Sequence, residues 1–301
     1  YNQTANGNLL QVLETAYNIN VISPTWFFLN DNTGNFSSIA SANYVQTAHS
    51  KGLQVWALVE DITYDVDTYE ILANSDNRTH LIDGLVSAAV DYDLDGLNID
   101  LEGIRQRDGA HFVQFLRELS IRCREEGIIL SVDNYPPNQG NKYYDYKEQG
   151  IIADYVVLMN YDEHWGGSGE PGSTSSQPFV ENSIQNLLKV VDSSKVINAL
   201  PFYTRLWKTS GGKVTDNAVI MKAIDANVSQ LGMIIDADEA TGQKYAKADV
   251  NGVLYEMWIE DQASMENKLK TVAENDLAGI AAWRLGYESQ AVWELIGQYI
   301  K

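Results

Sequence analysis

The sequence is poor in cysteine, in basic residues and in long apolar runs, and each shortage narrows the possible classes of protein. The single cysteine, Cys123, rules out an internal disulfide, and its place in a helical pattern predicts a buried structural thiol. Only 21 Lys and Arg residues stand against 41 Asp and Glu, which gives a formal net charge of −20. Such an acidic chain disfavours nucleic acid and anionic membranes as partners. No run approaches the roughly 20 apolar residues of a membrane span, so we expect no membrane insertion.

Histidine is also scarce, with four residues and no H-x-x-x-H spacing. His164, between Glu163 and Trp165, is therefore better explained by a structural role or a substrate contact than by metal binding. We expect no metal and no cofactor. The chain starts at Tyr1 with no methionine and no signal peptide, so we expect it to be a processed or truncated piece of a longer, secreted protein.

Strand-like and helix-like runs alternate along the 301 residues, which indicates βα units, a parallel sheet and an α/β fold that fits one (β/α)8 TIM barrel. The predicted helices include 41–50, 79–92, 110–126 and 262–274. Seven strands are predicted where a closed barrel needs eight, so we expect the first strand to lie at or before Tyr1 and to be missing or truncated. The seven predicted strands are 20–29, 53–59, 94–101, 128–133, 155–161, 196–203 and 279–283.

Residues 1–301 are expected to form a single catalytic domain and a monomer. A small α+β insertion is predicted after the seventh strand position, at about 205–258. Within it we expect a helix over 216–231 and a hairpin that pairs 233–236 with 254–259.

The octapeptide 95–102, Asp-Gly-Leu-Asn-Ile-Asp-Leu-Glu, is the most informative segment of the chain. Its apolar residues alternate with Asn98, Asp100 and Glu102, which is the period of a strand. Such a strand directs two carboxylates and an amide to one face. Burying them without partners costs several kcal/mol per ion, so we interpret the segment as a catalytic strand.

The same segment also fits the calcium-loop pattern D-x-[DN]-x-[DN]-G-x₅-E, through Asp91, Asp93, Asp95, Gly96 and Glu102. Three observations favour the strand. The eighth loop position is Asn98 where an aliphatic residue is normal, the residues after Glu102 make a poor exit helix, and the chain has no second loop to pair with this one.

Polar and aromatic residues follow several predicted strands at their carboxyl ends, which lie on one face of a barrel. Aromatic rings stack on sugars, and acids bind hydroxyls or protonate a glycosidic oxygen, so this composition indicates a carbohydrate site. The residues concerned are Glu102, Ser131, Asp133, Asn134, Tyr135, Met159, Tyr161, Asp162, Tyr203 and Trp283.

Residues 95–102 resemble the DGxDxDxE signature of family 18 glycoside hydrolases, the chitinase-like enzymes, and 159–162 resembles the M-x-Y-D motif of that family. Trp283 matches the tryptophan of its eighth strand. The segments 161–165, 201–203 and 258–261 are similar to the spore-germination and cortex-lytic branch, whose members cleave peptidoglycan next to N-acetylglucosamine. The chain departs from the motif at Asn98, which replaces an aspartate and removes a negative charge beneath Asp100, and at Leu101.

The resemblance implies substrate-assisted retaining catalysis, in which the 2-acetamido oxygen of the substrate is the nucleophile. Glu102 would be the acid, Asp100 would hold the acetamido N–H, and Tyr161 would donate to the acetamido oxygen. The implied substrate-binding residues are Asp162, Trp283, Asn98, Met159, Asp133 and Tyr203.

The expected function is hydrolysis of β-1,4 bonds next to N-acetylglucosamine, with peptidoglycan as the first substrate and chitin-type oligomers as the second. The alternative is a catalytically weak or inactive carbohydrate-binding protein on the same barrel. The implied location is extracellular or associated with a bacterial cell wall or spore.

Overall fold

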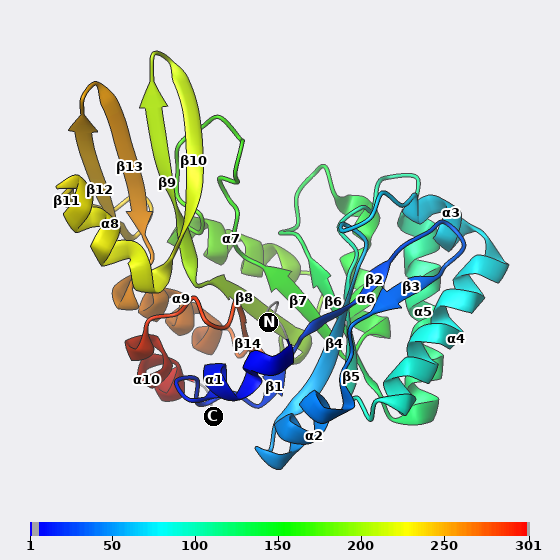
Figure 1. Cartoon of the computed structure of the whole chain (residues 1–301). Coiled ribbons are helices and arrows are strands. Elements are labelled where there is room, and N and C mark those ends of the chain that lie inside the picture. Colours follow the sequence, from blue (N-terminus) through cyan, green and yellow to red (C-terminus); the bar gives the residue numbers. More distant parts are fainter. Residues whose placement is uncertain (2–5, 300–301) are drawn as a thin grey trace. The chain divides into compact units, whose positions relative to one another are not determined.

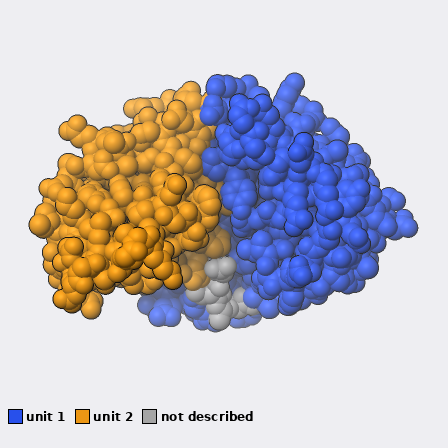
Figure 2. All heavy atoms as spheres, turned by 90° about the horizontal axis from the view of Figure 1, so that it is seen from above, with its two compact units in different colours: residues 1–14, 19–158, 186–197 blue, residues 15–18, 159–185, 198–301 orange. Residues whose placement is uncertain are grey.

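The structure, a computed structural model, describes Tyr1 and residues 6–299. The chain forms two compact units, coloured separately in Figure 2. Unit 1 comprises residues 1–14, 19–158 and 186–197, and unit 2 comprises residues 15–18, 159–185 and 198–301. Strands β7 (Tyr155–Met159) and β8 (Val196–Pro201) begin in unit 1 and end in unit 2. No helix in the described ranges is long and apolar enough to cross a membrane.

Unit 1 is built on a mainly parallel sheet with the strand order β3-β2-β4-β5-β6-β7. The pairs β2–β4, β4–β5, β5–β6 and β6–β7 are parallel, β3 is antiparallel to β2, and β1 lies parallel to the start of β4. The strands are β1 (Val21–Ile22), β2 (Thr25–Leu29), β3 (Phe36–Ser38), β4 (Gln54–Glu60), β5 (Gly96–Asp100) and β6 (Ile129–Asn134).

The helices of unit 1 connect these strands, and α4 and α5 lie side by side along the sheet in Figure 1. Asn74 caps α4 through its side-chain oxygen, and Gly127 ends α5 in the left-handed region (φ 71°), as its position in the sequence predicts. Cys123 of α5 is buried, which confirms the predicted burial of its thiol. The helices are α1 (Leu9–Leu13), α2 (Ala42–Ser50), α3 (Thr68–Ala73), α4 (Ser75–Asp91), α5 (Gly109–Glu126) and α6 (Tyr146–Ile152).

One face of this sheet carries Trp56, Asn98, Asp100, Ser131 and Tyr155, because alternate residues of a strand share a face. Trp56 stacks on Tyr155 with ring centroids 5.3 Å apart. Gly96 makes this packing possible, since a Cβ there would lie 2.7 Å from the indole Cδ1. The polar residues of β5 therefore sit on a packed, buried face.

Each of the seven predicted strands overlaps an observed one, with one interruption. The run predicted over 20–29 divides into β1 and β2 at Ser23 and Pro24, because proline has no N–H to donate to a neighbouring strand. The first barrel strand was expected at or before Tyr1, and residues 2–5 lie outside the described part of the chain.

Unit 2 contains a five-stranded antiparallel sheet with the order β10-β9-β13-β12-β11. The β12–β13 hairpin turns at Asn251 and Gly252, both at positive φ (55° and 77°), as a two-residue type I′ turn requires. The end of β8 and β14 (Gly279–Trp283) also belong to this unit. The strands of the antiparallel sheet are β9 (Tyr203–Ser210), β10 (Lys213–Ile220), β11 (Ile234–Asp238), β12 (Gln243–Val250) and β13 (Val253–Ile259).

Four helices complete unit 2 or start in it: α7 (Gln177–Leu187), α8 (Ile224–Leu231), α9 (Gln262–Glu274) and α10 (Gln290–Tyr299). Asp261, the residue before the predicted helix 262–274, caps α9 in a reciprocal capping box with Ser264.

Two details predicted for the insertion are wrong. The helix expected over 216–231 begins only at Ile224, because 213–220 is strand β10, a mostly exposed edge strand without a clear apolar period. Residues 233–236 do not pair with 254–259, because β12 lies between β11 and β13. Because the sequence of β12 is polar, the apolar pattern did not predict this strand, and the observed sheet has more strands than the predicted one.

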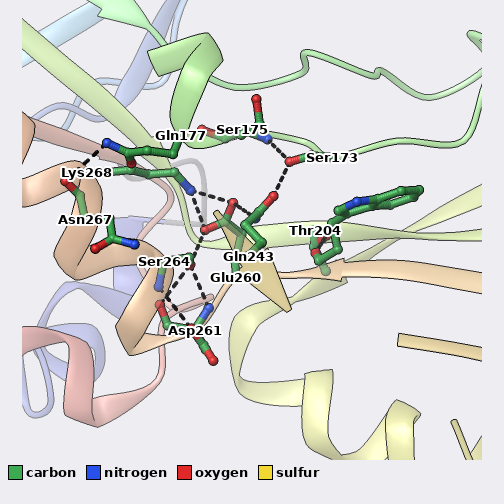
Figure 3. A network of polar contacts seen from close by, with 12 residues as sticks. Ser173, Ser175, Gln177, Thr204, Gln243, Glu260, Asp261, Ser264, Asn267 and Lys268 are labelled. Carbon is green, nitrogen blue, oxygen red and sulfur yellow. Dashed lines mark hydrogen bonds and ion pairs between the residues drawn. The ribbon is translucent and has the colours of Figure 1, made fainter. Parts of the chain in front are cut away.

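A buried polar network in unit 2 links β12, α9 and the loop after β7 (Figure 3). Lys268 donates to both carboxylate oxygens of Glu260 at 2.7 Å, and each of these residues is 1% exposed. Gln243 donates to Glu260 at 2.7 Å, Ser264 donates to it at 2.8 Å, and Ser173 of the loop donates to Gln243. This network anchors the loop that begins with the M-x-Y-D segment.

Candidate active site

Strand β5 presents the first group of predicted site residues. All five of its residues are buried, with Asn98 2% and Asp100 7% exposed, and Glu102 follows the end of the strand at intermediate exposure. The strand interpretation of 95–102 is therefore correct. Within the described residues no group of three or more His, Cys, Asp or Glu side chains could hold a metal ion.

Asn98 is the centre of a hydrogen-bonded cluster with the neighbouring strand β6. Ser131 donates to the Asn98 Oδ1 at 2.5 Å, and the Asn98 Nδ2 donates to Asp133 Oδ2 at 2.9 Å. The Tyr1 hydroxyl donates to Asp133 Oδ1 at 2.8 Å. The amide of Asn98 thus has a donor on one side and an acceptor on the other, which fixes its orientation.

Asp100 is a buried carboxyl with an unused acceptor. Its Oδ1 has no hydrogen-bond partner among the described residues. Burial raises the pKa of Asp100 well above its usual range, and the nearby Asp133 and Glu102 carboxylates raise it further. A buried acceptor with no partner costs free energy unless a ligand supplies a donor, so Asp100 suits an N–H or O–H group of a substrate.

Glu102 is held from two sides. Its backbone N–H donates to Asp61 Oδ1 at 2.9 Å, and the Tyr135 hydroxyl donates to its carboxylate. Asp61 also accepts from Gly103 N and from Thr68 Oγ1, and its burial raises its pKa. The backbone turn after β5 is therefore fixed by Asp61, and the Glu102 carboxyl is fixed by Tyr135.

Unit 2 places Tyr161, Asp162 and Tyr203 together. The Tyr203 hydroxyl donates to Asp162 Oδ1 at 2.7 Å, and the Tyr161 and Tyr203 rings meet edge to face with centroids 6.3 Å apart. Arg205 donates to the same Asp162 oxygen at 3.3 Å and to Asp216 at 2.7 Å. The bonds from Tyr203 and Arg205 both end on Oδ1, and no described residue donates to Oδ2 of this partly exposed carboxylate, so Oδ2 can accept from a sugar hydroxyl.

Met159 and Trp283 lie at the ends of β7 and β14. Met159 is buried, and Trp283 has intermediate exposure while its backbone oxygen accepts from Phe202 N at 2.7 Å. Phe202 thereby ties the end of β8 to the end of β14 beside Tyr203. Both predicted residues stand at carboxyl ends of strands, as the sequence indicated.

The predicted residues fall into two groups. Unit 1 brings together Asn98, Asp100, Glu102 and Asp133, and unit 2 holds Met159, Tyr161, Asp162, Tyr203 and Trp283.

Sequence reasoning did not select Asp61, Arg205 or Asp216 as site residues, and it named Tyr135 only among the aromatic residues at strand ends, with no catalytic or binding role. Asp61 and Tyr135 directly follow the observed strands β4 and β6, two residues after the predicted strand ends, and this position was an available signal for both. Arg205 and Asp216 lie on β9 and β10, so only the pairing of these strands brings them to Asp162.

Comparison with known proteins gives one consistent result. The model of the glycosyl hydrolases family 18 matches residues 27–288. The glycosylase YvbX of Bacillus subtilis is 25% identical over 97% of this chain and 88% of its own length. A cortical fragment-lytic enzyme of Bacillus anthracis is 27% identical over 85% of this chain, but the match spans only 61% of that enzyme.

Among solved structures, the spore cortex-lytic enzyme SleL of Bacillus megaterium superposes with a TM-score of 0.87. The match covers 99% of this chain and 71% of that one, at 21% identity. This likeness shows the fold, which is a (β/α)8 TIM barrel, and the predicted fold class is confirmed.

Proposed function

This chain belongs to glycosyl hydrolase family 18 and is a glycosidase, and we propose that it cleaves β-1,4 bonds next to N-acetylglucosamine by substrate-assisted, retaining catalysis. Peptidoglycan is the proposed first substrate, and chitin-type oligomers are the second. The cortical fragment-lytic relative supports this order, as does the likeness of the segments 161–165, 201–203 and 258–261 to the cortex-lytic branch.

The observation that carries the proposal is the state of Asp100. Among the described residues its buried Oδ1 has no partner, and the Glu102 carboxylate, two residues further along the chain, is near enough to raise the pKa of Asp100. An acetamido N–H would supply the missing donor. Once it holds that group, Asp100 aligns the acetamido oxygen for attack and stabilises the positive charge that forms on the ring.

Glu102 is assigned as the acid. It protonates the glycosidic oxygen while the acetamido oxygen attacks the anomeric carbon and the bond to the leaving sugar breaks. Glu102 then takes a proton from the water that opens the cyclic intermediate, so the starting state is restored. The Tyr135 hydroxyl keeps the carboxyl in place during both steps.

The residues of unit 2 are assigned to the sugar. Tyr161 donates to the acetamido oxygen, Asp162 binds a hydroxyl through its second oxygen, and Trp283 offers an aromatic face. Tyr203 and Arg205 fix Asp162 by the bonds described above. Met159 at the end of β7 and Asn98 on β5 are assigned to support these contacts with the sugar.

We propose an extracellular or cell-wall- or spore-associated location, as part of a longer secreted bacterial protein, and a monomeric state.

The proposal is tested with muropeptides and N-acetylglucosamine oligomers. Glu102→Gln should lower kcat by several orders of magnitude while sugar binding persists, because it removes the proton and keeps the shape. Proton NMR of the first product should show retention, and a thiazoline mimic of the intermediate should bind more tightly than N-acetylglucosamine. Inversion, or equal turnover of substrates without the acetamido group, contradicts the mechanism. Binding without turnover by the unaltered protein favours the carbohydrate-binding alternative.

A further inference from the structure

In this structure Asp133 is poorly placed to contact a substrate, although the sequence predicted that role. The residue is only 3% exposed, and both of its carboxylate oxygens already accept a hydrogen bond, from Tyr1 and from Asn98. A side chain so enclosed has little surface to offer a sugar. Its neighbourhood points to another function.

Asp133 and Asp100 occupy equivalent places on adjacent parallel strands. Asn98 pairs with Ser131 and Ile99 with Val132, so Asp100 and Asp133 are the next residues along β5 and β6. The hydrogen bonds of Asn98 to Ser131 and Asp133 show that these alternate residues share one face. The two carboxyl groups are therefore neighbours in a buried layer.

Apart from the α-amino group of Tyr1, whose positive charge lowers the pKa of Asp133, the groups around this pair are acidic or neutral. Glu60 of β4 pairs with Asp100 across the sheet, and Asp61 follows Glu60 in the chain. Glu102 follows β5 and Tyr135 follows β6. The Tyr1 hydroxyl donates to Asp133. Among the described residues, no Lys or Arg forms an ion pair with either carboxyl. Two buried carboxyls in such surroundings cannot both be ionised cheaply.

We propose that Asp133 is a positioning residue that shares one proton with Asp100, so that the acidic partner of Asp100 lies on β6 and not at position 98 of β5. This inference rests on the proposed function of Asp100. When Asp100 receives a substrate N–H, its own O–H bond breaks and an O–H bond forms on Asp133. The pair keeps a charge of −1, and no proton is exchanged with solvent.

Asn98 has a separate task in this arrangement. As an amide it donates to Asp133 and accepts from Ser131, so it connects the pair to the sheet without adding a third charge. Position 98 and position 133 could therefore exchange their side chains. After such an exchange the amide on β6 would donate to the carboxylate on β5, and Ser131 and Tyr1 would keep acceptors.

The test is a set of three variants of the full chain: Asp133→Asn, Asn98→Asp and the double exchange, with Asp83→Asn as a surface control. Asp83 lies on α4, pairs with Arg122 and is half exposed. In Asp133→Asn, Asp100 has no partner to take its proton and must release it to solvent, so the acid limb of the kcat/KM profile should move to higher pH by about 1 unit or more. The double exchange should return the limb to its original pH, and the control should not move it.

An unchanged profile in Asp133→Asn overturns the proposal. So does a double exchange that folds but does not restore the profile, because a neighbouring carboxyl that can share the proton would then not account for the profile. Variants too slow for kinetics are measured by ¹³C NMR titration of labelled aspartate carboxyls, where Asp133→Asn should lower the midpoint of Asp100. If the unaltered protein hydrolyses none of the substrates, the proposed function fails, while the NMR titration still decides whether the pair shares a proton.

Discussion

The buried ion pair of Lys268 and Glu260 gives a quantitative prediction about unit 2. Lys268→Met removes the cation and leaves the carboxyl 1% exposed, with donors only from Gln243 and Ser264. Removing one partner of a buried pair costs about 3–5 kcal/mol, because the remaining charge has no compensation. The two neutral donors reduce this loss, so we expect the lower end, about 3 kcal/mol of unfolding free energy at pH 7.

The double variant Glu260→Gln with Lys268→Met tests the cause. It removes both charges and retains an amide that Gln243 and Ser264 can still contact, so we expect it to lie within about 1–2 kcal/mol of the unaltered protein. Both variants are measured by urea denaturation, followed by tryptophan fluorescence.

The pH dependence has a definite sign. Burial raises the pKa of Glu260 even beside Lys268, and loss of the cation raises it further. A carboxyl with a raised folded-state pKa contributes full stability below its unfolded value and loses it as pH rises through the folded value. The deficit of Lys268→Met should therefore be largest near neutral pH and shrink in acid. If the single and double variants are equally unstable, packing and not charge is the cause, and the reasoning is refuted.

Three further predictions concern unit 1. Tyr135→Phe should lower kcat by roughly 10- to 100-fold with little change in KM, because the proposed acid loses its anchor; an unchanged kcat argues against that anchor. Gly96→Ala should cost about 1–3 kcal/mol in urea denaturation, since its Cβ would lie 2.7 Å from Trp56, whereas Gly279→Ala meets no atom within 4 Å and should be nearly neutral. Burial raises the pKa of Asp133 to about 7, so its stabilising contribution is complete below its unfolded pKa of about 4 and declines as pH rises toward 7. Asp133→Asn should flatten this slope in denaturation curves taken between pH 5 and 8, and an identical slope would contradict the assignment.

The sequence alone determined the parallel strands, and it selected most of the residues of the proposed site. Strongly alternating or apolar runs predict strands because burial on one or both faces leaves a clear pattern, and 95–102 is such a run. Asp261, which caps α9, and Gly127, which ends α5, act on adjacent residues, so their roles can be predicted from the local sequence. Of the catalytic residues proposed here, Asp100 is the last residue of β5, Glu102 follows β5 and Tyr161 follows β7, so their positions are predicted together with the strands.

Only the tertiary structure decided which polar groups meet. Strands β10 and β12 are polar and partly exposed, so their period is weak and their pairing depends on neighbours distant in the chain. Asp133 shows the same limit at the site. Its residue type and its position at a strand end suggested a cleft residue. Strand register instead places it beside Asp100, with hydrogen bonds from Tyr1 and Asn98. Register is a long-range property, because it is set by packing of whole strands, and no local pattern specifies it.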